Sequence, residues 1–380
     1  MDYKPFLSWE NVESALKRSK RFSPQNLKKS FHKLCFFSIH VIGTNGKGSV
    51  SYKIAYALEK AGFKVGLLTS PHLECVTERI QINRKPIDLK TLQNIRNAIP
   101  FEESWYMHLF LVAIQYFQQN CVDFVVFEAG MGARLDPIRL IDPFLTVITS
   151  IGYDHTQDLG NTLEKIALEK GALFTKDLVI SSQALTPTIL TLALKRGTNV
   201  TIAQTDDNDY QSTNTYTALK AIEFFKKKGI IPFSTDFKEL YKVVPKGRFE
   251  EIKKGVILDV AHNPQGLEAL IAKCRQKYPV GGILIIGGYK DKDLVSVLKG
   301  THEYFSKIFV CDLAKKDPRM LPQETLKMQI ETITKREVFL VEDPFKQAYL
   351  EKDEKNLLLV CGGFQMVKEA KKRFKDFPDR

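Results

Sequence analysis

The sequence predicts an α/β protein: a parallel-sheet N-terminal domain that contains a phosphate-binding loop (P-loop), followed by a smaller, doubly wound C-terminal domain. Three observations predict this class. Apolar, strand-like runs alternate with helical patterns along almost the whole chain, a glycine-rich segment joins one such run to a helix, and a second alternating set begins near residue 248. Alternation of this kind favours a mostly parallel sheet with helices on both faces.

The N-terminal elements are predicted from periodicity. Lys47–Ala61 places Ile54, Ala55 and Leu58 on one face, as in an amphipathic helix, whereas Ser38–Gly43 is a mostly apolar run typical of a buried strand. On the same grounds we predict strands at Val65–Thr69, Asp123–Glu128, Leu145–Ile151, Asp177–Ser181 and Asn199–Ala203, and helices at Leu109–Gln119 and Thr162–Phe174.

A domain boundary is expected near Val244–Gly247, where proline and glycine interrupt the pattern. We therefore predict domains at residues 1–245 and 248–380, the second with a Rossmann-like arrangement. Its expected strands are Val256–Val260, Gly282–Ile286, Lys307–Cys311, Glu337–Val341 and Asn356–Cys361, and its expected helices are Pro264–Tyr278, Asp291–Thr301, Pro322–Thr332, Asp343–Lys352 and Phe364–Phe374.

Composition excludes several classes of protein. The 380 residues are 44% hydrophobic and 26% charged, which is typical of a globular chain and excludes a disordered or collagen-like one. No stretch approaches the ~20 consecutive apolar residues of a membrane helix. The N-terminal segment MDYKPFLSWENVE lacks the apolar core of a signal peptide. We therefore expect a cytoplasmic protein with no membrane partner.

The charge of the chain is strongly basic. Its 56 Lys and Arg residues against 44 Asp and Glu residues give a formal net charge of +12. A basic surface suits either nucleic acid or a small polyanion. Because the basic residues are spread along the chain and no RNA- or DNA-binding pattern is present, we expect no nucleic-acid partner. A small polyanionic ligand and a solvated basic face are the alternatives.

The segment GTNGKGS, residues 43–49, directly follows a predicted strand and opens a predicted helix. In that position backbone N–H groups and the helix N-terminus cradle phosphate oxygens, a lysine adds positive charge, and a hydroxyl can ligate Mg²⁺. The spacing departs from the usual GxxxxGK[ST] motif, and the alternative is a structural glycine-rich turn. The predicted nucleotide-binding residues of this loop are Thr44, Asn45, Gly46, Lys47, Gly48 and Ser49.

Further motifs follow the loop in a recognisable order. They are Ser70–Leu73 (SPHL), Thr77–Ile80 (TERI), Glu128–Asp136 (EAGMGARLD), Thr149–Thr156 (TSIGYDHT), Gly247–Arg248, Leu258–Pro264 (LDVAHNP) and Lys290–Asp293 (KDKD). Taken together with GTNGKGS, this series resembles the folylpolyglutamate synthase/dihydrofolate synthase family, within the wider Mur ligase group. The chain departs from the family at Tyr106-Met107, where members have Phe-Glu.

The resemblance implies a magnesium site with Glu128 and His155 as ligands and Ser49 and Ser70 as hydroxyl contributors. The residues themselves allow this, since Glu128 ends a predicted strand and His155 follows one, beside the loop where open α/β sheets bind ligands. A carboxylate, a hydroxyl and an imidazole can form a partial Mg²⁺ shell. Taken alone, Glu128 would be interpreted as a solvated strand end and His155 as a structural residue.

Five other residues receive roles from the resemblance alone. The family places a carbamylated lysine at Lys170, which by its spacing alone would be a solvated helix lysine. The resemblance also implies that Arg248 and Asp259 contact ATP, that Asn214 binds adenine, and that His262 lies near the incoming amino acid. Capping or surface pairing is the alternative for each of these four.

The resemblance implies an ATP-dependent acid–amino-acid ligase with ATP and Mg²⁺ as cofactors and with folate or dihydropteroate and L-glutamate as partners. The reaction would be glutamate addition to folate, and also to dihydropteroate, through an acyl phosphate, by a monomeric enzyme. No match to the family's dihydropteroate-binding segment is found around Arg18–Leu27. The alternatives are a Mur-type ligase acting on a cell-wall precursor and, from another class, a P-loop nucleotide-switch protein.

Overall fold

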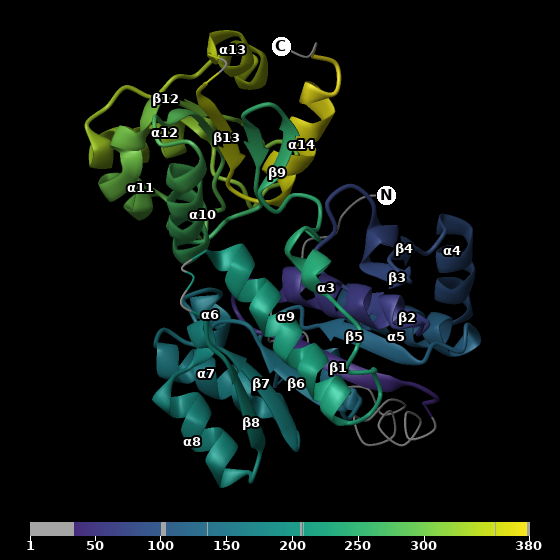
Figure 1. Ribbon diagram of the computed structural model, residues 1–380. Coiled ribbons are helices and arrows are strands. Elements are labelled where there is room, and N and C mark those ends of the chain that lie inside the picture. The colour runs from purple at the N-terminus through teal and green to yellow at the C-terminus, as the bar shows by residue number, and fades with distance from the viewer. Residues whose placement is uncertain are drawn as a thin grey trace. The chain divides into compact units, whose positions relative to one another are not determined.

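The structure is a computed structural model that describes residues 34–99, 104–134, 136–205, 207, 209–353 and 355–377. The chain divides between Val243 and Val244 into two compact units, each with its own sheet (Figure 1). Both units alternate strands with helices, which confirms the predicted α/β class. Among the described residues, none of the helices combines the length and apolar character needed to cross a bilayer.

The first unit is built on an eight-stranded sheet of order β4-β3-β2-β5-β1-β6-β7-β8. Strands β2, β5, β1, β6, β7 and β8 run parallel, whereas β3 and β4 extend one edge in antiparallel fashion. The strands are β1 (Phe37–Ile42), β2 (Val65–Leu68), β3 (Ile80–Ile82), β4 (Lys85–Pro86), β5 (Phe124–Glu128), β6 (Leu145–Ile148), β7 (Asp177–Ser181) and β8 (Asn199–Ala203).

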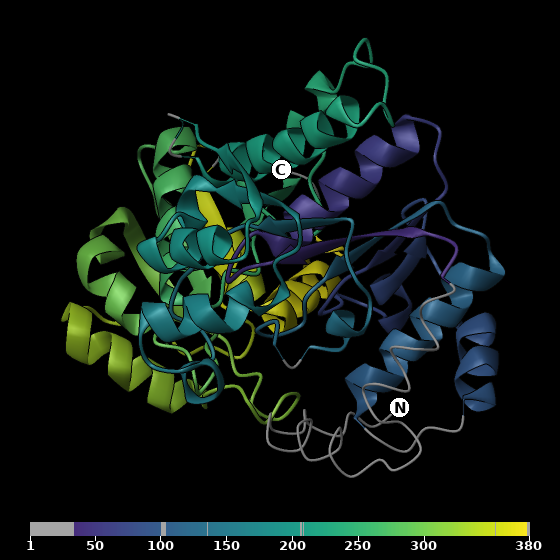
Figure 2. The ribbon, with the colours of Figure 1, turned by 90° about the horizontal axis from the view of Figure 1, so that it is seen from below.

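Helices cover both faces of this sheet because its strands alternate between two apolar cores. In β5, Phe124 and Val126 join the core beneath α3 and α9, while Val125 and Phe127 join the core beneath the other helices. In Figure 2 the purple α3 and the teal α9 lie on one side of the sheet and the blue α4 and α5 on the other. The helices are α3 (Lys47–Lys60), α4 (Leu89–Ala98), α5 (Trp105–Gln119), α6 (Thr156–Leu159), α7 (Leu163–Lys170), α8 (Pro187–Lys195) and α9 (Tyr210–Lys227).

The second unit is a doubly wound sheet of order β12-β11-β13-β10-β9, parallel except for β9. Helices α10, α11 and α12 enclose one core, and Phe345 and Tyr349 of α13 contact Phe374 of α14 in a second aromatic group. The elements are β9 (Glu250–Lys253), β10 (Val256–Leu258), α10 (Pro264–Lys277), β11 (Gly282–Ile286), α11 (Val295–Thr301), β12 (Phe305–Val310), α12 (Gln323–Thr334), α13 (Pro344–Glu351), β13 (Leu357–Cys361) and α14 (Phe364–Phe374).

One predicted strand, Glu337–Val341, is wrong. Only Phe339 forms a bridge, to Phe309, and the backbone of Val338 is satisfied by side chains of α12 instead of by a neighbouring strand. The Glu331 carboxylate accepts from the Val338 N–H at 3.0 Å, and the Lys327 ammonium donates to the Val338 carbonyl at 2.5 Å. This apolar run therefore has the composition of a strand, although the backbone of Val338 is hydrogen-bonded to side chains of α12.

Candidate active site

The glycine-rich loop lies where β1 ends and α3 begins. Gly46 is the N-cap residue of α3 and adopts φ +84°, in the left-handed region that favours glycine. A Cβ built on Gly46 would lie 2.3 Å from Oδ1 of Asn214, a buried residue of α9. The loop therefore approaches α9 closely, and the positive end of the α3 dipole points at the loop, where an anion is favoured.

The segment that follows β6 holds the glycine-rich loop in place through hydrogen bonds. The Thr44 hydroxyl donates to the Gly152 carbonyl at 3.1 Å and accepts from the Gly152 N–H at 3.0 Å. The Asn45 carbonyl accepts from the hydroxyls of Thr149 at 2.6 Å and Ser150 at 3.1 Å. These four hydrogen bonds fix the Thr44 side chain and the Asn45 carbonyl, and so help to hold the loop in shape.

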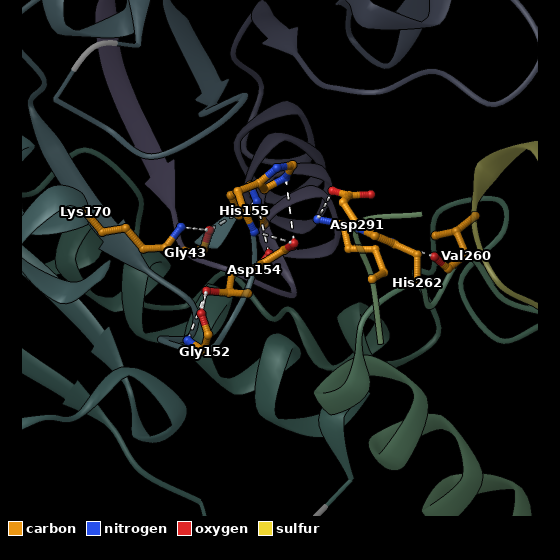
Figure 3. Close-up of polar contacts among 11 residues, drawn as sticks. Gly43, Gly152, Asp154, His155, Lys170, Val260, His262 and Asp291 are labelled. Carbon is orange, nitrogen blue, oxygen red and sulfur yellow. Dashed lines mark hydrogen bonds and ion pairs between the residues drawn. The ribbon is translucent and has the colours of Figure 1, made fainter. Parts of the chain in front are cut away.

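Two lysines meet at the carbonyl of Gly43. The Lys47 ammonium donates to this oxygen and to the Thr44 carbonyl, both at 3.1 Å. The Lys170 ammonium, at the end of α7, donates to the same Gly43 oxygen at 2.7 Å (Figure 3). The sequence alone favoured a solvated Lys170, but its side chain is only 3% exposed. The structure therefore brings Lys47 and Lys170 together at the loop.

The environment of Lys170 lowers the pKa of its ammonium group from 10.5 to about 7. Burial is the largest cause, because it penalises the charged form, and the positive charge of Lys47 is the second. The carboxylates of Asp154, Glu169 and Asp136 act in the opposite direction. Near neutral pH, Lys170 is therefore much more often a neutral amine than an ordinary exposed lysine is.

Two of the predicted magnesium residues are in direct contact. The backbone N–H of Ser70, two residues beyond β2, donates to Oε2 of Glu128 at 3.0 Å. Glu128 ends β5 and is buried, and Ser49 lies in the first turn of α3 and is also buried. Because β2, β5 and β1 are adjacent in the sheet, their carboxyl ends bring these segments to one edge.

His155, the fourth predicted magnesium residue, follows β6 and is the N-cap residue of α6, with φ +48°. The backbone N–H of His155 donates to Oδ1 of Asp154 at 2.9 Å, and the ring atom Nε2 of His155 lies 3.8 Å from the same oxygen (Figure 3). Among the described residues, no group of three or more His, Cys, Asp and Glu side chains is placed to hold a metal. The predicted magnesium set contains only two such side chains, Glu128 and His155, together with the hydroxyls of Ser49 and Ser70, and it stays a prediction.

Asp136 received no role from the sequence, but it organises the segment after Glu128. Its carboxylate accepts from the N–H groups of Gly130 at 2.7 Å, Met131 at 3.3 Å and Ile138 at 3.1 Å. Burial raises the pKa of Asp136 to about 6, although these three donors act in the opposite direction. Its place at the end of the EAGMGARLD motif was the only signal that could have identified it.

The predicted residues of the second unit lie around the end of β10. The Asp259 carboxylate accepts from the N–H groups of Phe249 and Ala261, both at 2.7 Å, and so ties together the segments on either side of β9 and β10. Nδ1 of His262 lies 2.9 Å from the Val260 carbonyl (Figure 3). The Arg248 guanidinium lies 5.5 Å from the ring centre of Phe364. Their predicted roles stay predictions.

Comparison with known proteins places this architecture in a class. Residues 41–237 match the family model of the Mur ligase middle domain, and residues 247–364 match that of the Mur ligase, glutamate ligase domain. The phosphate loop and the two α/β units are thus those of a Mur-type ligase.

Curated relatives narrow the class further. The dihydrofolate synthase/folylpolyglutamate synthase of Bacillus subtilis is 28% identical over 394 residues, covering 89% of this chain and 90% of the relative. The enzyme of the same name from Haemophilus influenzae is 30% identical over 319 residues, covering 69% and 71%. This chain belongs to the folylpolyglutamate synthase/dihydrofolate synthase family.

A solved structure shows the same fold. The bifunctional folylpolyglutamate synthase/dihydrofolate synthase of Yersinia pestis, complexed with AMPPNP and Mn ion, aligns with a TM-score of 0.79 at 24% identity. The alignment covers 97% of this chain and 94% of that chain.

Proposed function

We propose that this chain catalyses ATP-dependent amide formation between a carboxylate of folate and the α-amine of L-glutamate. The observation that carries the proposal is the loop at the end of β1, where Lys47 and Lys170 converge on the Gly43 carbonyl beside the Ser70–Glu128 contact. Membership of the family and the match to a glutamate ligase domain support the reaction class.

The described residues fit a nucleotide with a divalent metal. Two features of Gly46 favour glycine in this part of the cradle: its φ of +84°, and the lack of room for a side chain beside Asn214. Lys47, on the loop, would meet phosphate oxygens. The groups that would hold Mg²⁺ are the oxygens of Ser49, Ser70 and Glu128 and the imidazole of His155. When bound, Mg²⁺ would offset negative charge on the transferring phosphoryl group.

The chemistry requires activation because a carboxylate is a poor electrophile. Transfer of the γ-phosphoryl group to a carboxylate oxygen of folate releases ADP and gives an acyl phosphate. The neutral amine of glutamate then attacks the carbonyl carbon, the bond to phosphate breaks, and the amine loses a proton. Lys47 offsets charge on the phosphoryl group, and the loop holds the nucleotide in line, so positioning and electrostatics supply most of the catalysis.

We also propose that the acceptors include both tetrahydrofolate and dihydropteroate, with folylpolyglutamate synthesis as the principal activity. The net charge of +12 suits an acceptor that gains negative charge with each glutamate, although salt limits this attraction to about 8 Å. Arg18–Leu27, the segment compared with the family's dihydropteroate-binding region, lies outside the described residues. A cytoplasmic, monomeric enzyme that acts without nucleic acid or membrane completes the proposal.

The test is a product assay with three acceptors. Purified protein is incubated with ATP, Mg²⁺ and glutamate together with tetrahydrofolate, dihydropteroate or a UDP-linked cell-wall precursor, and products are analysed by mass spectrometry. The proposal expects a one-glutamate mass increase on tetrahydrofolate and dihydropteroate, with release of ADP and phosphate. The Lys47→Ala variant is the control for contaminating activity. Glutamate addition to the cell-wall precursor alone, or nucleotide hydrolysis with no ligated product, would refute it.

A further inference from the structure

A tyrosine that the sequence comparison marked only as a departure from the family lies directly behind the predicted metal residues. Tyr106 is in the first turn of α5, and its hydroxyl donates to the backbone carbonyl of Glu128 at 3.4 Å. The same hydroxyl also interacts with the side chain of Ser70. The backbone N–H of Ser70 in turn donates to the Glu128 carboxylate at 3.0 Å, so each of the three residues contacts the other two.

The ring of Tyr106 is held as firmly as its hydroxyl. A Cβ built on Gly130 would lie 2.8 Å from Cζ of Tyr106, so the ring packs directly on the backbone just beyond Glu128. That backbone is fixed independently, because the Gly130 N–H donates to the buried Asp136 carboxylate at 2.7 Å. The position of the hydroxyl is therefore set by packing and does not depend on a free rotation of the side chain.

The donors and acceptors in these contacts indicate what the contacts do. A serine hydroxyl that ligates a metal does so with an oxygen lone pair, and its own proton must be donated elsewhere. The neighbouring Tyr106 hydroxyl is available to accept that proton, because its own proton goes to the Glu128 carbonyl. Groups behind a metal ligand that fix its orientation in this way commonly change metal affinity when they are removed.

We propose that Tyr106 is a positioning residue, which orients the Ser70 hydroxyl and the end of β5 so that Ser70 and Glu128 present oxygen lone pairs to a divalent cation bound with the nucleotide. The inference rests on the proposed function. Tyr106 touches no reacting atom in this scheme and acts through its two neighbours.

The variant Tyr106→Phe removes the hydroxyl and retains the packed ring. Binding of Mn²⁺ in the presence of a non-hydrolysable ATP analogue is measured from the loss of the free Mn²⁺ signal in electron paramagnetic resonance. We expect the Mn²⁺ affinity to fall about three- to tenfold, the effect of one neutral hydrogen bond. In turnover, the Mg²⁺ concentration for half-maximal activity should rise by a similar factor, while kcat at saturating Mg²⁺ changes less than about twofold.

The matched control is Tyr116→Phe, ten residues or about 15 Å further along the same helix. It should leave Mn²⁺ affinity unchanged. The inference is overturned if Tyr106→Phe binds Mn²⁺ as tightly as the wild type, or if both variants weaken it equally. In either case a wild-type enzyme that still ligates glutamate leaves the proposed function standing. A wild-type protein that neither binds Mn²⁺ with the analogue nor ligates glutamate would overturn both.

Discussion

Replacing Lys170 by methionine should change how the stability of the first unit depends on pH. The pKa of Lys170 is about 7 in the folded state, against 10.5 for an ordinary exposed lysine, so the unfolded chain binds more protons between these values. Stability therefore rises with pH in this window: the cost of burying the charge is present in full below pH 7 and is relieved as the pH rises through 7. The Lys170→Met variant has no such group.

The size of the effect follows from linkage. Each pH unit over which the unfolded state binds one extra proton adds about 1.4 kcal/mol to the free energy of unfolding. We integrate this difference in bound protons from pH 7, where the folded state is taken as half protonated, to pH 9. The free energy of unfolding of the wild type should then rise by about 2 kcal/mol more than that of Lys170→Met. Groups that do not interact with Lys170, such as Lys53, whose pKa burial lowers to about 8, contribute equally to both proteins and cancel.

The assay is urea denaturation at both pH values in buffer free of carbon dioxide. Tryptophan fluorescence reports the first unit, because both tryptophans, Trp9 and Trp105, precede the division at Val243. A difference below about 0.5 kcal/mol between the two proteins would refute the argument that burial depresses this pKa.

The same lysine is the residue that the family resemblance marks for carbamylation. Only the neutral amine adds carbon dioxide, forming a C–N bond and releasing one proton, and the lowered pKa of Lys170 favours the neutral amine near pH 7. With ¹³C-labelled bicarbonate, wild-type protein should show a carbamate carbon signal that Lys170→Met lacks. Identical spectra from the two proteins would show that Lys170 is not carbamylated.

Three further predictions concern the loop and its metal residues. Lys47→Ala should lower turnover at least ~10²-fold, since one preorganised charge-stabilising donor is lost; near-normal turnover with an unchanged circular dichroism spectrum would contradict this. Gly46→Ala should cost about 1–3 kcal/mol in urea denaturation and weaken nucleotide binding in calorimetry, because it combines φ +84° with a Cβ 2.3 Å from Asn214. Glu128→Gln should weaken Mn²⁺ binding with nucleotide at least ~10-fold, and equal affinities would exclude Glu128 as a ligand.

Much of the candidate site could be predicted because parallel sheets obey a simple rule. Residues after β2, β5, β1 and β6 are far apart in the sequence, but these strands are consecutive in the sheet and their carboxyl ends meet at one edge. Ser70, Glu128, Gly43 and Ser150 each follow or end one of them. Strand periodicity and loop motifs were therefore enough to identify the edge where these residues gather.

The supporting contacts could not be predicted in the same way. Tyr106 lies on α5, and which of its neighbours it meets depends on how that helix packs on the sheet, which periodicity does not determine. Lys53 is similar: it lies in the middle of α3 and is buried because its ammonium donates to the carbonyls of Leu240 and Val243. Tyr106 and Glu128 are 22 residues apart, and Lys53 is 187 residues from Leu240. In neither case does a local pattern mark the partner.

The two lysines at Gly43 are also linked to each other, which affects how their variants are interpreted. After burial, the charge of Lys47 is the largest cause that keeps the pKa of Lys170 low. Removing that charge in Lys47→Ala should raise the pKa of Lys170, so that more of it is a cation at pH 7 and less can form a carbamate. Activity lost in Lys47→Ala therefore includes any contribution from Lys170. The ¹³C carbamate signal of Lys47→Ala measures this indirect part: a signal as strong as that of the wild type would show that the two lysines act independently.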